Sequence, residues 1–323
     1  DCIGGVCFQP PAEPPPSPNG TPPIRATEEE LEELVAAPPR RLFDPARPQR
    51  MRAALPGDRH KLALVRFHSD EGWAWPGADQ PSTHIVKPES GEYPEMVFNE
   101  MFCMSVLAEA GLLVAPTAVE TIGGRPCLVS ERFDRAISAG TIGRLHQESF
   151  CQALSFAPDA GPENEDACGP GFAEAAGLLR AGGERKRVLD LVVLALCNYI
   201  LGNGDCHGEN LALMLTPTGS LLAPFYDVVS TAVYDDPTHV GMVVADDYDE
   251  SAYLLELAEI CEEAEIDFEH CRKVAASVAV RMDDALEAVA ERSRREGWHA
   301  PVIDRIVELA GERAVNLGYE VQY

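Results

Sequence analysis

The segment ILGNGDCHGENLAL, residues 200–213, places four polar side chains in a short stretch between two apolar runs: Asp205, His207, Glu209 and Asn210. An Asp followed five positions later by an Asn is the spacing of the protein-kinase catalytic loop. In that loop the Asp takes the proton of the substrate hydroxyl and the Asn holds a magnesium ion. The same residues could also form an ordinary turn or a metal site. The spacing alone arises by chance in many proteins, so further parts are needed to decide.

Phosphoryl transfer needs three further groups, and the sequence supplies candidates in kinase order. Asp227, in APFYDVVST, would bind a metal that bridges the nucleotide phosphates. Lys87 ends the run THIVK and would neutralise the phosphates, and Glu100 in the next helical segment would orient it. Each residue alone has a simpler explanation: a helix N-cap for Asp227, a solvated strand end for Lys87, a helix-dipole position for Glu100 and a satisfied loop position for His207. Four parts in order are more specific than any one, so the sequence predicts ATP phosphotransfer.

The composition limits the classes of function that suit the chain. Its 323 residues carry 53 acidic and 26 basic side chains, a net charge of −27, which disfavours binding of nucleic acid by this chain alone. The ten cysteines are scattered without a C-x-x-C pair, which favours reduced cysteines of a cytoplasmic protein over zinc ligands or disulfides. No apolar run reaches about 18 residues, so we expect no membrane span. The chain starts with Asp1 and shows no signal peptide, which suggests a fragment lacking its natural N-terminus.

The order of the expected elements predicts an α+β protein with two lobes. Residues 10–53 are expected to form a Pro-rich linker with one short helix, which opens in a capping box of Thr27 and Glu30. Residues 54–133 predict strand, strand, helix, strand and strand, a small β-rich lobe. Residues 134–323 are expected to form a larger all-helical lobe. Its expected helices include an amphipathic one in HQESFCQAL and a buried one in RKRVLDLVVLALCNYIL.

Six motifs in one order resemble the HipA-like serine/threonine kinases, the toxin halves of bacterial toxin–antitoxin pairs. They are THIVKP, NEMFCMSVLAEAGLLVAP, ERFDR, RLHQESFCQAL, NGDCHGEN and FYDVVST. The resemblance runs from about residue 54 to the C-terminus. It implies a bilobal protein-kinase-like fold that uses ATP and Mg²⁺. It also implies that residues 1–9 are the last strand of the family's small N-terminal subdomain, most of which is absent from this chain.

The resemblance further implies roles for single residues. Asp205 is similar to the family's proton acceptor, and Asn210 and Asp227 to its metal ligands. Residues 131–133 resemble the hinge that meets adenine, and Lys87 resembles the phosphate-binding lysine with Glu100 as its partner. The implied ATP-binding set is Gly57, Lys61, Lys87, Glu100, Glu131, Arg132, Phe133, His207, Asn210 and Asp227.

The resemblance also implies partners. The substrate would be a Ser or Thr of a cellular protein, in this family often an aminoacyl-tRNA synthetase or another part of the translation machinery. A DNA-binding antitoxin of HipB type would hold the kinase, so any contact with nucleic acid would be indirect. Two other functions stay open: a catalytically weakened pseudokinase that acts by binding an antitoxin, and a small-molecule kinase.

The sequence departs from the family pattern at two positions. Ala54, in ALPGDRHK, stands where the family carries a Ser whose autophosphorylation silences the kinase, so we expect no autoinhibition at that position. Glu209 stands directly before Asn210, where the family has a non-acidic residue. A carboxylate at about 4 Å from a phosphate would repel it by about 1 kcal/mol in water and several times that near a protein surface. We therefore expect one of three outcomes: the Glu209 side chain points to solvent, it recruits an extra metal ion, or it reduces the affinity for the nucleotide.

Overall fold

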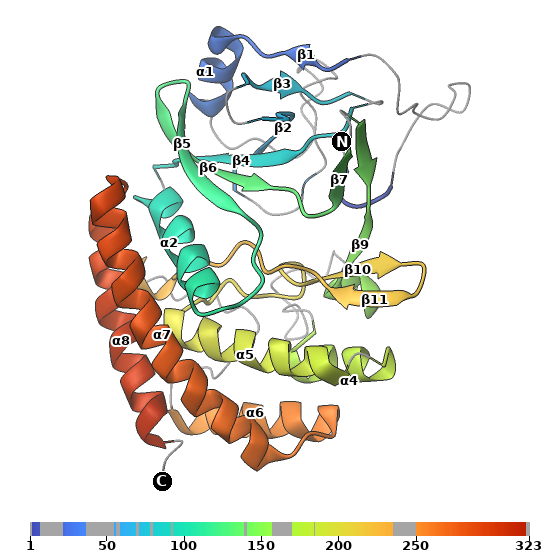
Figure 1. The fold of residues 1–323 in the computed structure, drawn as a ribbon. Coiled ribbons are helices and arrows are strands. Elements are labelled where there is room, and N and C mark those ends of the chain that lie inside the picture. Colours follow the sequence, from blue (N-terminus) through green and yellow to red (C-terminus); the bar gives the residue numbers. More distant parts are fainter. Residues whose placement is uncertain are drawn as a thin grey trace. The chain divides into compact units, whose positions relative to one another are not determined.

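A computed structural model describes the chain over residues 2–6, 22–36, 55, 59–68, 71–77, 80–91, 93–138, 141–156, 170–183, 185–234 and 250–320 (Figure 1). The chain forms two compact units. The first comprises Asp1–Val97 and Ala115–Gln147, and the second comprises Phe98–Val114 and Glu148–Tyr323. These bounds differ from the expected lobes at 54–133 and 134–323. The limits of the functional domains stay a prediction.

The first unit is built on a four-stranded antiparallel sheet in the order β2-β4-β6-β5. Its strands are β2 (Leu62–Leu64), β4 (His84–Pro88), β5 (Thr117–Ile122) and β6 (Arg125–Glu131). The helix α2 (Met96–Glu109) lies between β4 and β5 in the chain, so the predicted order strand, strand, helix, strand, strand is confirmed for the strands of this sheet. Two two-stranded sheets complete the unit, one of β1 (Ile24–Arg25) with β3 (Ala74–Trp75) and one of β7 (Arg135–Ser138) with β8 (Thr141–Arg144). The prediction missed β3, a short strand between β2 and β4 that pairs outside the four-stranded sheet.

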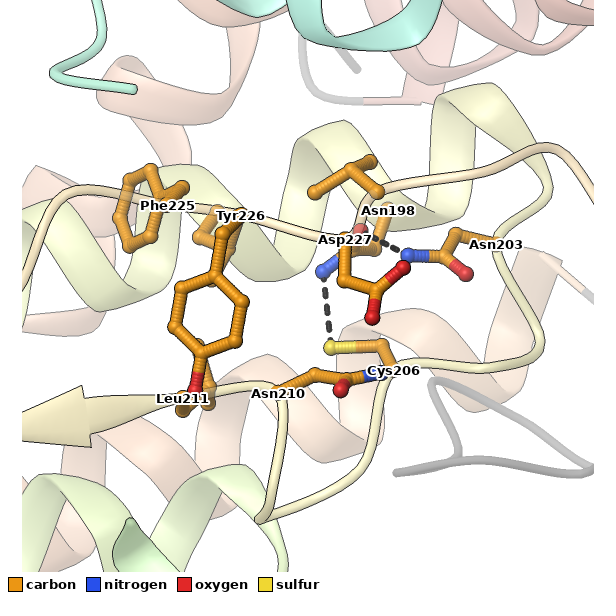
Figure 2. Close-up of a pocket in the computed structure, with 10 residues that line it drawn as sticks. Asn198, Asn203, Cys206, Asn210, Leu211, Phe225, Tyr226 and Asp227 are labelled. Atoms are coloured by element: carbon orange, nitrogen blue, oxygen red, sulfur yellow. Dashed lines mark hydrogen bonds between the residues drawn. The ribbon is translucent and has the colours of Figure 1, made fainter. Parts of the chain in front are cut away.

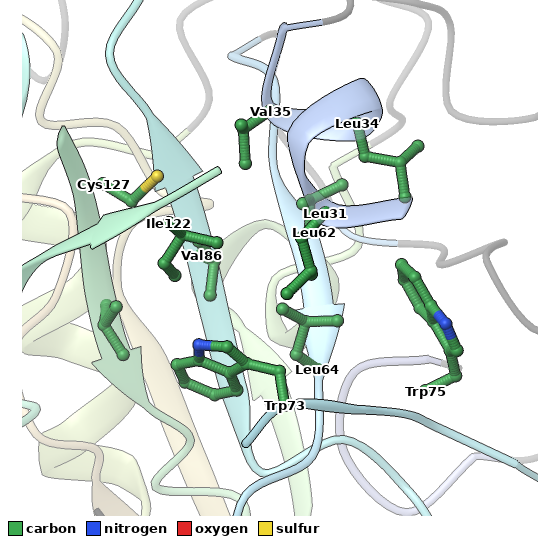
Figure 3. Close-up of a cluster of buried hydrophobic side chains, with 11 residues drawn as sticks. Leu31, Leu34, Val35, Leu62, Leu64, Trp73, Trp75, Val86, Ile122 and Cys127 are labelled. Atoms are coloured by element: carbon green, nitrogen blue, oxygen red, sulfur yellow. The ribbon is translucent and has the colours of Figure 1, made fainter. Parts of the chain in front are cut away.

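The helix α1 (Glu28–Ala36) belongs to the core of this unit. Its expected capping box is present, because the Glu30 N–H donates to Thr27 Oγ1 and the Thr27 N–H donates to Glu30 Oε2, both at 3.1 Å. Its apolar face joins a buried cluster shared with the sheet and two tryptophans (Figure 3), made of Leu31, Leu34, Val35, Leu62, Leu64, Trp73, Trp75, Val86, Ile122, Cys127 and Val129. Residues 22–36, which include the expected short helix, therefore pack as part of the sheet domain. The other residues of the expected linker, 10–21 and 37–53, lie outside the described residues.

A turn of two glycines between β5 and β6 fits closely under α1, and it gives a matched pair of substitutions. Both glycines have a left-handed backbone, with φ of +54° at Gly123 and +74° at Gly124. A Cβ on Gly123 would lie 2.6 Å from the Cα of Glu32, whereas a Cβ on Gly124 would meet nothing within 4 Å.

We expect Gly124→Ala to cost about 1–2 kcal/mol through its backbone alone. Gly123→Ala should cost about 1–3 kcal/mol more, because α1 must also move off the sheet. Urea denaturation of the two variants measures the difference, and equal losses of stability would contradict the close packing of α1.

The second unit is mainly helical. Its long helices are α4 (Phe172–Ala181), α5 (Arg185–Leu201), α6 (Glu250–Ala264), α7 (Phe268–Glu296) and α8 (Pro301–Glu320), together with most of α2. The predicted buried helix at 185–201 is confirmed as α5. No helix within the described ranges is both long and apolar enough to cross a membrane.

The expectation that the larger lobe is all-helical needs correction. A small sheet in the order β11-β10-β9 contains β9 (His146–Ser149), β10 (Ala212–Thr216) and β11 (Gly219–Leu222). The expected helix in HQESFCQAL is likewise wrong in its first half, which forms β9. Ser149 is the N-cap of α3 (Phe150–Ala153) and its side chain accepts from the Gln152 N–H, so the helix begins only after Ser149.

Candidate active site

The catalytic loop predicted from the sequence starts at the C-terminus of α5. The Gly202 N–H donates to the Tyr199 carbonyl at 3.1 Å and the Asn203 N–H donates to the Asn198 carbonyl at 2.9 Å, the two bonds of a Schellman motif. Gly202 takes the left-handed position, with a φ of +67°, and a Cβ there would lie 2.7 Å from the Cβ of Ala232. Only glycine fits both demands, so the buried helix stops sharply and the chain turns into residues 203–210.

The loop itself brings the predicted proton acceptor and metal ligand together. The Asn210 side-chain NH₂ donates to the Asp205 carbonyl at 2.7 Å, and the Asn210 N–H donates to the His207 carbonyl at 2.8 Å. The Asp205 carboxylate is about one-third exposed, with its Oδ1 3.6 Å from Nε2 of His207. The main chain of Asp205 is thus held in place, while part of its carboxylate is exposed.

Asp227 lies beside this loop. It lines one pocket together with Asn210 and eight other residues, namely Leu194, Asn198, Asn203, Cys206, Leu211, Phe225, Tyr226 and Val228. Figure 2 shows its carboxylate pointing toward the segment that carries Cys206 and Asn210. Its backbone is left-handed, with a φ of +58°, a conformation that Asp tolerates better than most residues. No helix begins at Asp227, since the 3₁₀ helix η2 starts only at Ala232, so the alternative role as an N-cap is wrong.

The segment after Asp227 is fixed by polar groups that the sequence did not single out. The fully buried Asn99 of α2 bonds both main-chain groups of Ser230, accepting its N–H at 2.8 Å and donating to its carbonyl at 2.9 Å. Thr231 Oγ1 accepts the Gly204 N–H at 2.7 Å, which ties this segment to the start of the loop. A polar residue inside an apolar helix, such as Asn99, is the signal that could have indicated such a role.

The donor set at this pocket fits a magnesium ion. Mg²⁺ prefers oxygen ligands and binds through one or two protein groups plus substrate phosphates. The Asp227 carboxylate would supply one oxygen, and the Asn210 amide, whose nitrogen donates to the Asp205 carbonyl, would supply another. Among the residues that the structure describes, no cluster of three or more His, Cys, Asp or Glu side chains forms a closed metal site.

Glu209 has a more specific environment than the sequence indicated. Its carbonyl accepts from the Tyr226 hydroxyl at 2.8 Å, which ties the loop to the segment of Asp227. Burial raises the pKa of the Cys151 thiol on α3 to about 11, with the Glu209 carboxylate as a second cause. The negative charge of Glu209 therefore disfavours the thiolate form of Cys151.

The remaining predicted ATP-binding residues are divided between the units. Lys87 lies on β4 opposite Leu128 of β6 and is 5% exposed, which argues against a solvated strand end. Glu131 ends β6 in the same unit, and Phe133 follows two residues later. Glu100 is buried on α2 within the second unit, so the pairing of Lys87 with Glu100 stays a prediction.

Arg132 has its side chain committed to the first unit. Its guanidinium donates to both carboxylate oxygens of Asp134 at 2.9 and 2.7 Å and to Ser82 Oγ at 2.9 Å. Burial alone would raise the pKa of Asp134, but the hydrogen bond and charge of Arg132, with Arg135, hold it below its usual range. Any contact of residue 132 with adenine would therefore come from its main chain.

The same network holds the N-terminal segment. The Gly4 N–H donates to Asp134 at 2.7 Å, and the Arg132 and Arg135 guanidinium groups donate to the Cys2 carbonyl at 3.0 and 2.9 Å. Within residues 2–6, a turn at positions 4–5 replaces the continuous strand expected for 1–9.

Only part of the predicted phosphate loop can be placed. Gly57 and Ala54 lie outside the described residues. Lys61 is half-buried next to His60, and the His60 Nε2 is 2.9 Å from the carbonyl of Leu34 in α1. The end of this segment is therefore attached to the helix that packs on the sheet.

Comparison with known proteins places these findings in a family. Residues 53–292 match the model of the HipA-like C-terminal domain. A protein of Sinorhizobium fredii, Y4mE, is 39% identical over 206 residues, which cover 63% of this chain and 48% of that protein. The serine/threonine-protein kinase toxin HipA of Shewanella oneidensis is 31% identical over 225 residues, 64% of this chain and 50% of that protein. The chain thus spans about half the length of these relatives.

One solved structure shares the fold over nearly the whole chain. It is the HipA, HipB and operator DNA complex of Shewanella oneidensis, with a TM-score of 0.75 and 24% identity over 99% of this chain and 75% of that chain. The predicted α+β kinase-like fold is confirmed by this likeness.

Proposed function

The chain belongs to the HipA-like C-terminal domain family, and we propose that it is a magnesium-dependent kinase that transfers the γ-phosphate of ATP to a serine or threonine of a cellular protein. The observation that carries the proposal is the meeting of three groups in one unit. Asn210 and Asp227 line one pocket, and Asn210 is hydrogen bonded to Asp205. A kinase-named relative, the HipA toxin, supports phosphotransfer as the class of reaction.

In the proposed reaction the substrate hydroxyl oxygen forms a bond to the γ-phosphorus while the bond to the β,γ-bridging oxygen breaks and ADP leaves. Asp205 takes the hydroxyl proton, since its carboxylate is partly exposed and its main chain is fixed. Asn210 and Asp227 would hold Mg²⁺, which neutralises charge on the phosphates when bound. Lys87 and Lys61 would add positive charge at the phosphates, and the main chain of residues 131–133 would meet adenine.

The partners belong to the same proposal. The solved relative contains HipB and operator DNA, which supports a HipB-type antitoxin as partner of this chain and indirect contact with DNA. The net charge of −27 agrees with a basic partner surface rather than with direct binding to nucleic acid. A protein of the translation machinery, such as an aminoacyl-tRNA synthetase, is the proposed substrate, and the cytoplasm the proposed location.

The acceptor class can be tested with cell extract and ATP labelled at its γ-phosphate. We expect label from the purified chain to appear on phosphoserine or phosphothreonine in the protein fraction, and to depend on Mg²⁺. Label only in the small-molecule fraction would replace the protein kinase by a small-molecule kinase. ATP binding without any transfer would favour the pseudokinase.

A further inference from the structure

Two buried asparagines below the catalytic loop have no role in the chemistry described so far. Asn198 lies in the apolar helix α5 and is 3% exposed, and Asn203 begins the loop and is 9% exposed. A buried amide is costly unless its oxygen and its nitrogen are both hydrogen bonded. Their hydrogen bonds therefore show what the two side chains hold.

The two amides form a directed chain of hydrogen bonds that runs from the Asp205 N–H to the Cys206 thiol. Figure 2 shows the links between Asn203, Asn198 and Cys206. The Asp205 N–H donates to Asn203 Oδ1 at 3.0 Å, the Asn203 NH₂ donates to Asn198 Oδ1 at 2.9 Å, and the Asn198 NH₂ donates to Cys206 Sγ at 3.0 Å. Because a main-chain N–H can only donate, Asn203 must turn its oxygen to Asp205. This choice fixes the orientation of both amides.

The position of Asn198 and Asn203 at the C-terminus of α5 indicates that their contact does more than fill space. In the Schellman motif at the end of α5, Asn198 lies three positions before the last helical residue, and Asn203 lies two positions after it. These two positions usually make a hydrophobic contact. Here a polar contact takes its place, although an apolar pair would end the helix equally well without burying amides. The amide pair differs from an apolar pair in what it can reach, namely the N–H of Asp205 and the thiol of Cys206.

We propose that Asn198 and Asn203 are positioning residues that set the main-chain geometry of Asp205 for proton acceptance, an inference that rests on the proposed kinase function. The Asp205 carbonyl is held by Asn210 and its N–H by Asn203, so both peptide groups flanking the carboxylate are fixed. Loss of the amide chain releases one of these groups. A displacement of about 1 Å in a catalytic group can cost about a hundredfold in rate.

The double variant Asn198→Leu/Asn203→Leu tests the proposal, because it restores the usual apolar contact of the helix stop while removing the amide chain. We expect the variant to keep the wild-type midpoint of thermal unfolding within a few degrees. Its kcat for magnesium-ATP turnover should fall at least about tenfold, with KM for ATP changed less than about threefold. Hydrogen–deuterium exchange of the peptide covering 203–211 should become faster, while the middle of α5 stays protected.

The outcomes separate this proposal from the proposed function. A folded double variant with wild-type kcat and unchanged exchange at 203–211 overturns the positioning role. If the wild type itself turns over no ATP, the kinase function fails, and the exchange measurement alone decides whether the amides hold the loop. If the double variant does not fold, Asn203→Ser is judged by the same two readouts. Its shorter hydroxyl can still accept from the Asp205 N–H but cannot reach Asn198, so we expect an intermediate loss of kcat.

Discussion

Asp205→Asn is expected to lower the rate of phosphate transfer by about 10²–10⁴-fold, the range in which a positioned general base contributes. The substitution keeps the size of the side chain and leaves in place the main-chain bonds to Asn203 and Asn210. It removes the carboxylate that would take the hydroxyl proton. The loss should therefore fall on kcat, while KM for ATP stays close to that of the wild type. Steady-state kinetics with labelled ATP and a protein extract measure both constants.

Asp190→Asn is the matched control for this prediction. Asp190 lies on α5 in the same unit, and its carboxylate forms a half-exposed ion pair with Arg187 at 3.0 Å. Such surface pairs contribute about 0–1 kcal/mol to stability, so we expect this variant to keep wild-type rates. Equal activity of Asp205→Asn and Asp190→Asn would remove Asp205 from the mechanism.

Asp227→Asn is expected to raise the Mg²⁺ concentration required for half-maximal activity by on the order of 10–10²-fold. Asn shares with Asp a tolerance of the left-handed backbone, so the φ of +58° at residue 227 is kept and the change removes only the charge. A neutral amide oxygen binds the hard cation less strongly than a carboxylate does. Titration of activity with Mg²⁺ at fixed ATP measures the shift.

The result also separates two roles of Asp227. If it binds the metal, saturating Mg²⁺ should recover part of the activity of Asp227→Asn, and thermal unfolding without metal should match the wild type. An unchanged Mg²⁺ requirement would show that Asp227 serves only the packing of its segment. A lower unfolding midpoint in the absence of metal would point the same way.

The loop at residues 203–210 was predictable as a loop because its signals are local in the chain. The spacing of Asp205 and Asn210, the apolar run of α5 and the glycine at 202 lie within one segment, and periodicity and stop signals define them without knowledge of distant contacts. The capping box of α1 was predictable for the same reason.

Other features depend on partners far along the chain and were not predictable in this way. Asn99 bonds Ser230 across 131 positions, and Arg132 bonds Cys2 across 130. β9 is a strand because it joins β10, which outweighs the helical spacing of HQESFCQAL. The packing of α1 on the sheet likewise required Gly123, whose close approach to Glu32 no local pattern reveals. One sequence shows which residues are polar within apolar surroundings, but not what they meet.

Phosphorylation of cellular protein through Asp205 is tested most directly by a phosphoproteomic comparison. Cells expressing the wild type are compared with cells expressing equal amounts of Asp205→Asn, with Asp190→Asn as reference. We predict phosphoserine or phosphothreonine sites that appear with the wild type and with Asp190→Asn and are absent with Asp205→Asn. The same set of sites in all three samples would contradict the claim.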